Sequence, residues 1–238
     1  MPLSEQPPLL LGLDQVSRRF GNRTVVDQVT LSVKPGEFHL LVGPNGSGKS
    51  TIARLGVGLL RPHRGTARVA GADPRSSENA RRLIGYLGHE SQLYADLTPV
   101  ENLQFAARLH GLAQIDATVA AMLDRLEVAT ERTIAVRRLS RGYVQRVAIC
   151  RSLIHRPSLL VWDEPLTGLD QSSLDRVVGL VESVLAEGVA VVLVSHDLPE
   201  LWRLAGRVHV VEQGTIRFSA TTATPLAEFR RQYAEPAR

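Results

Sequence analysis

The fold of this chain is constrained most by one glycine-rich segment, which reads Gly43-Pro44-Asn45-Gly46-Ser47-Gly48-Lys49-Ser50. The segment fits the pattern G-x-x-x-x-G-K-[ST] and lies between an apolar run, Phe38 to Val42, and a helix-like stretch, Thr51 to Leu60. In such a strand-loop-helix unit, backbone N–H groups and the positive end of the helix converge on a phosphate. We therefore expect an α/β fold with a P-loop core, a parallel sheet and a bound nucleotide.

The end of this segment indicates a nucleoside triphosphate held together with Mg²⁺. Lys49 is expected to reach the β- and γ-phosphates, and the Ser50 hydroxyl is expected to ligate Mg²⁺, with Thr51 beside it in the first helical turn. The alternative is a glycine-rich turn that binds nothing. Lys49 is one of only two lysines among 28 basic residues, which disfavours a chance match.

Two later apolar runs end in residues suited to hydrolysis. Leu159 to Trp162 is followed by Asp163, where a Mg²⁺-linked carboxylate is expected, and by Glu164, which can orient or deprotonate the attacking water. Val189 to Val194 leads to His196, which we expect to contact the γ-phosphate. A strand-ending turn at Asp163 and an ordinary surface histidine at position 196 remain the alternatives.

An octapeptide between these motifs, Leu139-Ser140-Arg141-Gly142-Tyr143-Val144-Gln145-Arg146, resembles the signature motif of the ATP-binding cassette family, whose commonest form is Leu-Ser-Gly-Gly-Gln. Arg141 stands at the first usual glycine and Tyr143 at the usual glutamine. Further family motifs match in order at Phe20, His89, Thr167-Gly168-Leu169-Asp170 and His196. The resemblance covers nearly the whole chain.

The resemblance implies roles for several residues. Phe20 would stack on adenine, although a core residue on an edge strand is the alternative. His89 stands where the family usually has a glutamine that contacts Mg²⁺ or the water and links the site to the membrane partner, with Gln92 as the fallback. Ser140 and Gly142 would cover the ATP held by an opposite cassette, so a complete site requires a dimer. Ser140 also fits the N-cap of the next helix.

The pattern of apolar residues predicts one cassette domain over residues 1–238. Segments 1–88 and 157–238 are expected to form the core with an antiparallel β layer, with strands near 9–16, 28–33 and 65–70 in that layer and buried strands near 37–42, 83–87, 158–162 and 189–194. Residues 89–156 are expected to form a helical subdomain with helices at Val100–Leu109, Ile115–Leu126 and Ser140–Ile154. A hairpin at Gln213-Gly214 and a short docked helix carrying Leu226, Phe229 and Tyr233 complete the expected fold.

Composition narrows the classes of function. With 238 residues and 44% apolar content, the chain can bury one substantial core. It has no apolar run near the roughly 20 residues that span a bilayer, so we expect an integral membrane permease in another chain. Leu9 to Leu13 is too short for a signal peptide and lacks a basic leader. The single Cys150, expected to be buried, excludes an internal disulfide and suits a reducing cytosol. We expect a peripheral protein at the cytoplasmic face of the cell membrane.

The net charge is +4, the basic residues are almost all arginine, and the arginine pairs among them are scattered, which favours solvated faces over a nucleic-acid surface. The segments Gly85 to His89 and Leu93 to Leu103 look like the coupling region of exporters. With Leu-Ser-Arg-Gly in the signature, they are similar to the ATP-binding subunit of the haem exporter family of cytochrome c maturation. The alternatives are an ABC-2-type drug or lipid exporter ATPase, a soluble cassette ATPase acting on ribosomes or DNA, and a nucleotide kinase, which would leave the signature unexplained.

Overall fold

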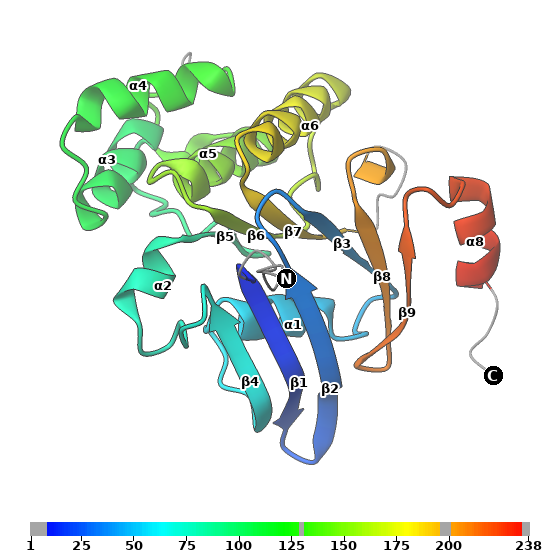
Figure 1. The fold of residues 1–238 in the computed structure, drawn as a ribbon. Coiled ribbons are helices and arrows are strands. Elements are labelled where there is room, and N and C mark those ends of the chain that lie inside the picture. The colour runs from blue at the N-terminus through cyan, green and yellow to red at the C-terminus, as the bar shows by residue number, and fades with distance from the viewer. Residues whose placement is uncertain (1–8, 129–130, 196–200, 235–238) are drawn as a thin grey trace, which may run out of the picture.

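The computed structural model describes residues 9–128, 131–195 and 201–234, and its centre is a six-stranded sheet of order β5-β6-β7-β3-β8-β9 (Figure 1). Neighbouring strands of this sheet run parallel except for the β8–β9 pair, which is antiparallel. The strands are β3 (Phe38–Val42), β5 (Ile84–Leu87), β6 (Leu159–Asp163), β7 (Ala190–Val194), β8 (Arg207–Glu212) and β9 (Thr215–Thr221). Every residue of β3, β6 and β7 is buried, and apart from His39 and Asp163 all of these residues are apolar.

A second sheet is antiparallel and has the order β2-β1-β4. Its strands are β1 (Leu11–Phe20), β2 (Arg23–Val33) and β4 (Arg64–Val69). Helix α1 (Lys49–Gly56) lies between the two sheets (Figure 1). Side chains from both sheets and from this helix, among them Leu13, Leu41 and Ile52, share one apolar cluster. The start of α1, which carries the glycine-rich segment, is thereby fixed against both layers.

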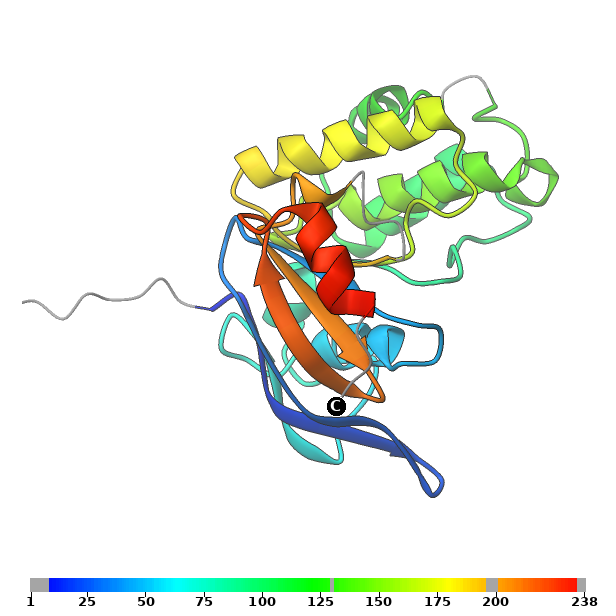
Figure 2. The ribbon, with the colours of Figure 1, turned by 90° about the vertical axis from the view of Figure 1, so that its right-hand side faces the viewer.

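Helices cover the opposite face of the large sheet (Figures 1 and 2). They are α3 (Pro99–Leu109), α4 (Ile115–Arg125), α5 (Arg141–Leu153) and α6 (Gln171–Ala186). The second apolar cluster lies between these helices and the sheet. Successive side chains of β3 point to opposite faces of the sheet, so Leu40 and Val42 belong to this cluster and Leu41 belongs to the cluster on the other face. A short 3-10 helix, Val136–Arg138, precedes α5. The helices expected between 89 and 156 are confirmed, and the domain boundaries stay a prediction.

The C-terminal helix α8 (Leu226–Ala234) packs against the β8–β9 hairpin (Figure 2). Phe229 is fully buried, and its ring centroid lies 4.8 Å from that of Trp202, 5.8 Å from that of Phe218 and 6.0 Å from that of Tyr233. The expected hairpin and the docked helix are therefore both confirmed.

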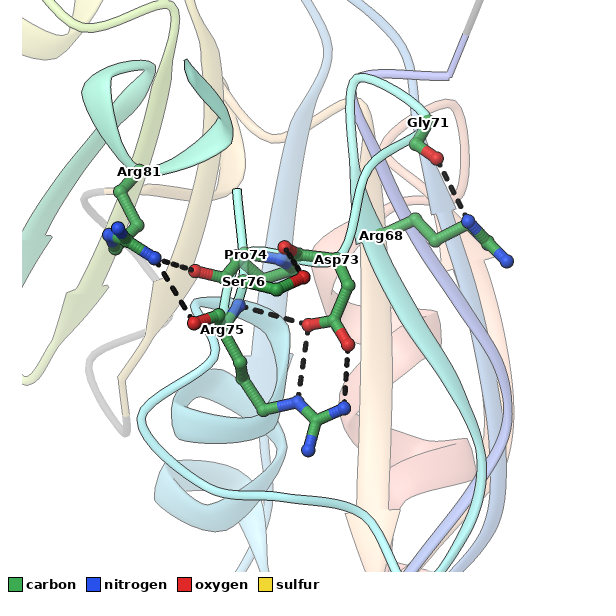
Figure 3. Close-up of polar contacts among 7 residues, drawn as sticks. All are labelled: Arg68, Gly71, Asp73, Pro74, Arg75, Ser76 and Arg81. Carbon is green, nitrogen blue, oxygen red and sulfur yellow. Dashed lines mark hydrogen bonds and ion pairs between the residues drawn. The ribbon is translucent and has the colours of Figure 1, made fainter. Parts of the chain in front are cut away.

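The loop between β4 and helix α2 (Glu78–Arg82) is ordered by its own charged groups (Figure 3). Asp73 accepts hydrogen bonds from Nε of Arg75 at 3.1 Å and from Nη2 of Arg75 at 2.6 Å. Arg81 donates to the carbonyls of Pro74 and Arg75, both at 3.1 Å. A Cβ on Gly58 would lie 3.0 Å from Pro74, so this loop braces the chain just after α1. Arg81 was expected to lie on a solvated surface, and the structure shows that it also stabilises this loop.

Several expected boundaries differ from the structure, including the start of β2, which lies at Arg23 and not near residue 28. β1 continues to Phe20 because it pairs with β2 as far as Arg23, and strand pairing leaves no mark on the apolar pattern of one strand. The helix expected to reach Leu60 ends at Gly56, since Gly58 has a left-handed φ of +78°. Within the described ranges, no helix is long and apolar enough to cross a membrane.

Candidate active site

The glycine-rich loop lies in close contact with β8 of the large sheet and β2 of the antiparallel sheet. Gly43 has φ +150° and Gly48 has φ +107°, a left-handed region that favours glycine. A Cβ on Gly43 would lie 2.1 Å from the carbonyl oxygen of Val211, and one on Gly48 would lie 2.7 Å from that of Val25. The glycines are therefore required both for the turn and for the close approach of β8 and β2, which fix the loop in place.

Lys49 is buried and folds back over the loop that precedes it. Its Nζ donates hydrogen bonds to the carbonyl oxygens of Gly43 at 2.8 Å and Pro44 at 2.9 Å. Burial lowers the pKa of Lys49, while the nearby carboxylates of Glu164 and Asp163 act to raise it. The ammonium group is thus held at the centre of the loop, where it can exchange two carbonyl partners for phosphate oxygens.

Ser50 and Asp163 meet at the same edge of the sheet. The Ser50 hydroxyl donates to Oδ1 of Asp163 at 3.1 Å. Asp163 is only 1% exposed, and within the described ranges its Oδ2 is a buried atom without a hydrogen-bond partner. A buried carboxylate oxygen without a partner is costly, and a hydroxyl and a carboxylate are the oxygen ligands that Mg²⁺ prefers. The donor set fits Mg²⁺.

Glu164 follows Asp163 in a strained conformation. Its φ is +55°, which is uncommon for a residue other than glycine, and its N–H donates to the Val194 carbonyl at 2.9 Å. Its side chain is half-buried, and its charge acts on Lys49. The sharp turn after β6 therefore brings Glu164 close enough to influence the lysine of the loop.

Phe20 lies at the end of β1 and is 47% exposed. The Arg18 guanidinium carbon lies 4.8 Å from the centroid of its ring. A ring with this exposure is not a core residue, which was the alternative for Phe20. It is free to stack on a planar ligand, and its contact with adenine stays a prediction.

His89 and Gln92 both follow β5, but their surroundings differ. His89 is exposed two residues beyond Leu87, which pairs with Trp162, the residue before Asp163. Since the carboxyl ends of parallel strands share one edge, His89 emerges on the side of the sheet where Asp163 lies. The Gln92 amide oxygen instead accepts from Arg151 of α5 at 3.4 Å. His89 stays the predicted coupling residue, with Gln92 as the alternative.

The signature segment begins α5. Ser140 is the N-cap and accepts a hydrogen bond from the Tyr143 N–H at 3.3 Å. A Cβ on Gly142 would lie 3.1 Å from the carbonyl of Gly168, so the start of α5 contacts the 167–169 turn of its own chain. Asp170 caps α6 by accepting from Ser173 N–H at 2.8 Å. The structure therefore places the start of the signature helix against the 167–169 turn of its own chain.

Several residues of the octapeptide, among them Tyr143, Gln145 and Arg146, have structural contacts that the sequence did not indicate. Tyr143 is buried, its hydroxyl donates to the Val128 carbonyl, and it accepts from the Glu131 N–H at 3.0 Å. Gln145 contacts the backbone beside Glu164. Helical spacing with Val147 offered a signal for the burial of Tyr143. His196, expected at the γ-phosphate, lies outside the described residues.

This arrangement of loop, lysine and paired carboxylates on a parallel sheet is that of a P-loop NTPase. The family model described as ABC transporter matches residues 26–167, and the chain belongs to this family. It is an ATPase subunit of an ABC transporter, and such subunits hydrolyse ATP to drive transport.

The chain is 35% identical over 211 residues to the Nod factor export ATP-binding protein I of Paraburkholderia xenovorans (strain LB400), covering 87% of this chain and 69% of the relative. It is 35% identical over 212 residues to the spermidine/putrescine import ATP-binding protein PotA of Pseudomonas aeruginosa (strain UCBPP-PA14), covering 88% of this chain and 58% of the relative.

Solved structures agree with the fold. An ATP-binding subunit of an ABC transporter has a TM-score of 0.84 at 28% identity, covering 94% of this chain and 93% of that chain. A dimeric bacterial ABC transporter cassette has a TM-score of 0.81 at 25% identity, covering 89% of this chain and 98% of that chain.

Proposed function

We propose that this ATPase acts with Mg²⁺ as a homodimer, bound at the cytoplasmic face of the cell membrane to an integral membrane permease, and that it powers export. The observation that carries the Mg²⁺ assignment is the buried Asp163 Oδ2, which lacks a partner within the described ranges while Oδ1 meets Ser50. Ser50 and Asp163, with His89 as a further contact, would hold Mg²⁺, and its charge would neutralise part of the charge of the triphosphate.

Different residues of the chain carry out different parts of ATP hydrolysis. The N–H groups of the loop, from Gly43 to Thr51, hold the phosphates, and Lys49 moves from the carbonyls of its own loop to the β- and γ-phosphate oxygens. Glu164 accepts a proton from the water whose oxygen attacks the γ-phosphorus. The bond from that phosphorus to the β–γ bridging oxygen breaks, and its electrons leave with ADP. His196 is assigned to orient the water.

A second copy completes each site in this proposal. Ser140 and Gly142 lie at the N-terminal end of α5, where N–H groups favour an anion, and within the chain they contact Tyr143 and the 167–169 turn. They are assigned to the γ-phosphate held by the opposite copy, and Phe20 to adenine. The dimeric relative supports this arrangement. ATP binding would close the two copies, and product release would open them.

The export assignment rests on the coupling region and the signature. The segments 85–89 and 93–103 and the sequence Leu139-Ser140-Arg141-Gly142 support an exporter, with haem export for cytochrome c maturation as the first candidate substrate class. An ABC-2-type drug or lipid exporter is the second candidate, and the Nod factor export protein among the relatives supports export. The polyamine import protein among them supports the opposite direction of transport. We also propose that 89–156 forms one subdomain against a core of 1–88 and 157–238.

Two measurements test the function. Glu164→Gln keeps the size of the side chain and removes the base, so it should bind ATP with Mg²⁺, lose turnover and accumulate as a dimer on a sizing column. Glu228→Gln on α8 is the matched control. Undiminished hydrolysis by Glu164→Gln would remove the assigned base. Purification of the tagged full chain in detergent should recover a multi-span membrane protein, and its absence would favour a soluble cassette ATPase.

A further inference from the structure

Gln145 joins the signature helix to the backbone that carries Glu164. It lies in the second turn of α5, and its side-chain amide donates to the carbonyl of Pro165 at 3.0 Å and to that of Glu164 at 3.4 Å. Both acceptors belong to the turn after β6. The contact joins residues that are 20 positions apart in the sequence. It connects α5 with the turn after β6, and the proposed function assigns these two elements to two different ATP sites.

Glu164 depends on such support because its backbone is strained. A non-glycine residue at φ +55° has a strained backbone, and this conformation persists where neighbouring groups hold it. The N–H of Glu164 is held from β7 by the Val194 carbonyl at 2.9 Å. Its carbonyl and the next one are held from α5 by Gln145. The peptide groups on both sides of Glu164 are therefore fixed, and with them the direction in which its carboxylate leaves the backbone.

A second contact ties the same helix to the same turn. The Cα of Gly142 packs so close to the Gly168 carbonyl that a Cβ would lie 3.1 Å from it. The first two turns of α5 thus meet both ends of the segment 164–168. A displacement of α5 at Gly142 would be passed to the Glu164 backbone through these contacts.

We propose that Gln145 is a positioning residue for ATP hydrolysis, which holds the Glu164 carboxylate in its working direction from the helix that carries Ser140 and Gly142. The inference rests on the proposed role of Glu164. Gln145 acts through two backbone carbonyls and takes no part in binding phosphate.

The sharpest variant is Gln145→Glu, because it keeps the shape of the side chain and exchanges the donor for an oxygen that faces two carbonyl oxygens. A misplacement of about 1 Å at a reacting group costs up to roughly 100-fold in rate, so we expect kcat to fall about 10- to 100-fold. The KM for ATP should stay within about twofold, since Lys49 and the loop are untouched. Gln145→Lys retains a donor and should recover most of the rate.

Gln114→Glu is the matched control, since it makes the same change at an exposed N-cap of α4 that has no side-chain cap hydrogen bond. The full chain is assayed for kcat, KM and thermal unfolding in wild type, Gln145→Glu, Gln145→Lys, Gln114→Glu and Glu164→Gln. A loss of kcat in Gln145→Glu with KM and unfolding temperature retained, and with recovery in Gln145→Lys, supports the inference. Wild-type turnover in Gln145→Glu overturns it, as does an equal loss in both Gln145 variants.

The outcome for Glu164→Gln separates this inference from the proposed function. If Glu164→Gln abolishes turnover while Gln145→Glu is normal, the positioning role fails and the assigned base stands. If Glu164→Gln turns over normally, the assigned base fails and the positioning role fails with it.

Discussion

The hydroxyl of Ser50 donates a hydrogen bond to Oδ1 of Asp163 at 3.1 Å, which joins the first turn of α1 to the end of β6 across 113 residues of sequence. The contact leaves Oδ2 of Asp163 buried without a partner within the described ranges. Two oxygens from different elements are therefore already in place for a cation. The pairing of β6 with β7 and of β7 with β3 fixes their separation, because β3 leads directly into the loop before Ser50.

Asp163→Asn should weaken Mg²⁺ binding strongly while keeping the fold. Asparagine retains the size of the side chain and an acceptor for Ser50, but it removes the charge that draws the cation. We expect ATPase activity to fall at least about 100-fold. Calorimetric titration of MgATP against ATP alone should show that the affinity gained from Mg²⁺ is lost. Asp96→Asn changes an exposed carboxylate paired with Arg137 and should leave both readouts unchanged. An unaltered Mg²⁺ dependence in Asp163→Asn would contradict the site.

Lys49→Met should weaken nucleotide binding and leave the stability of the fold nearly unchanged. The ammonium group is buried against the carbonyls of Gly43 and Pro44, so its desolvation offsets much of what those two hydrogen bonds contribute. We expect thermal stability without nucleotide to change by no more than about 1 kcal/mol, while ATP affinity falls at least about tenfold. Lys34→Met, at the only other lysine, serves as the control. Tight ATP binding by Lys49→Met would place the phosphates elsewhere.

The parts of the fold that could be predicted are those whose pattern lies within one short segment. β3, β6 and β7 are buried on both faces, so their apolar runs predicted them as strands. The glycine-rich loop follows β3, and it therefore predicted the edge of the sheet at which Asp163 and Glu164 lie. Contacts between distant segments left no such mark. The partners of Gln145 lie 19 and 20 residues away, and His39 meets His209 across 170 residues. Either contact depends on the strand order and helix packing of the finished fold.

Tyr143→Phe should destabilise the protein without removing its chemistry. The Tyr143 hydroxyl lies in the buried face of α5, donates to the Val128 carbonyl and accepts from the Glu131 N–H. Its loss leaves two backbone groups with fewer partners, so we expect about 1–3 kcal/mol less stability in urea unfolding. ATPase activity at low temperature should stay within about threefold of wild type, since no phosphate contact is assigned to this side chain. Tyr94→Phe, where the ring is 54% exposed, should have no measurable effect.

Two buried histidines, His39 on β3 and His209 on the neighbouring strand β8, form a hydrogen-bonded chain. Nε2 of His39 lies 3.0 Å from the Glu37 carboxylate, Nδ1 of His39 lies 3.0 Å from Nε2 of His209, and Nδ1 of His209 lies 2.7 Å from the Ser219 hydroxyl. Burial lowers the pKa of His209 to about 3, with the charges of His39 and Arg207 acting in the same direction. Burial also lowers the pKa of His39, against the opposing effect of Glu37. Both rings are therefore neutral in the folded protein at neutral pH.

These histidines should make the fold sensitive to acid. In the unfolded chain each histidine takes up a proton near pH 6.5, whereas in the folded chain it does not. The neutral histidines therefore contribute fully to the free energy of unfolding above pH 6.5. This contribution is lost as the pH falls toward the pKa values of the folded protein. For His209 the loss is about 1.4 kcal/mol per pH unit below 6.5. In urea unfolding at pH 7.5 and 5.5, His209→Gln should therefore lose less stability between the two pH values than wild type, although it starts lower. His63→Gln, at an exposed position, should keep the wild-type difference. An equal difference in wild type and His209→Gln would show that His209 titrates in the folded protein.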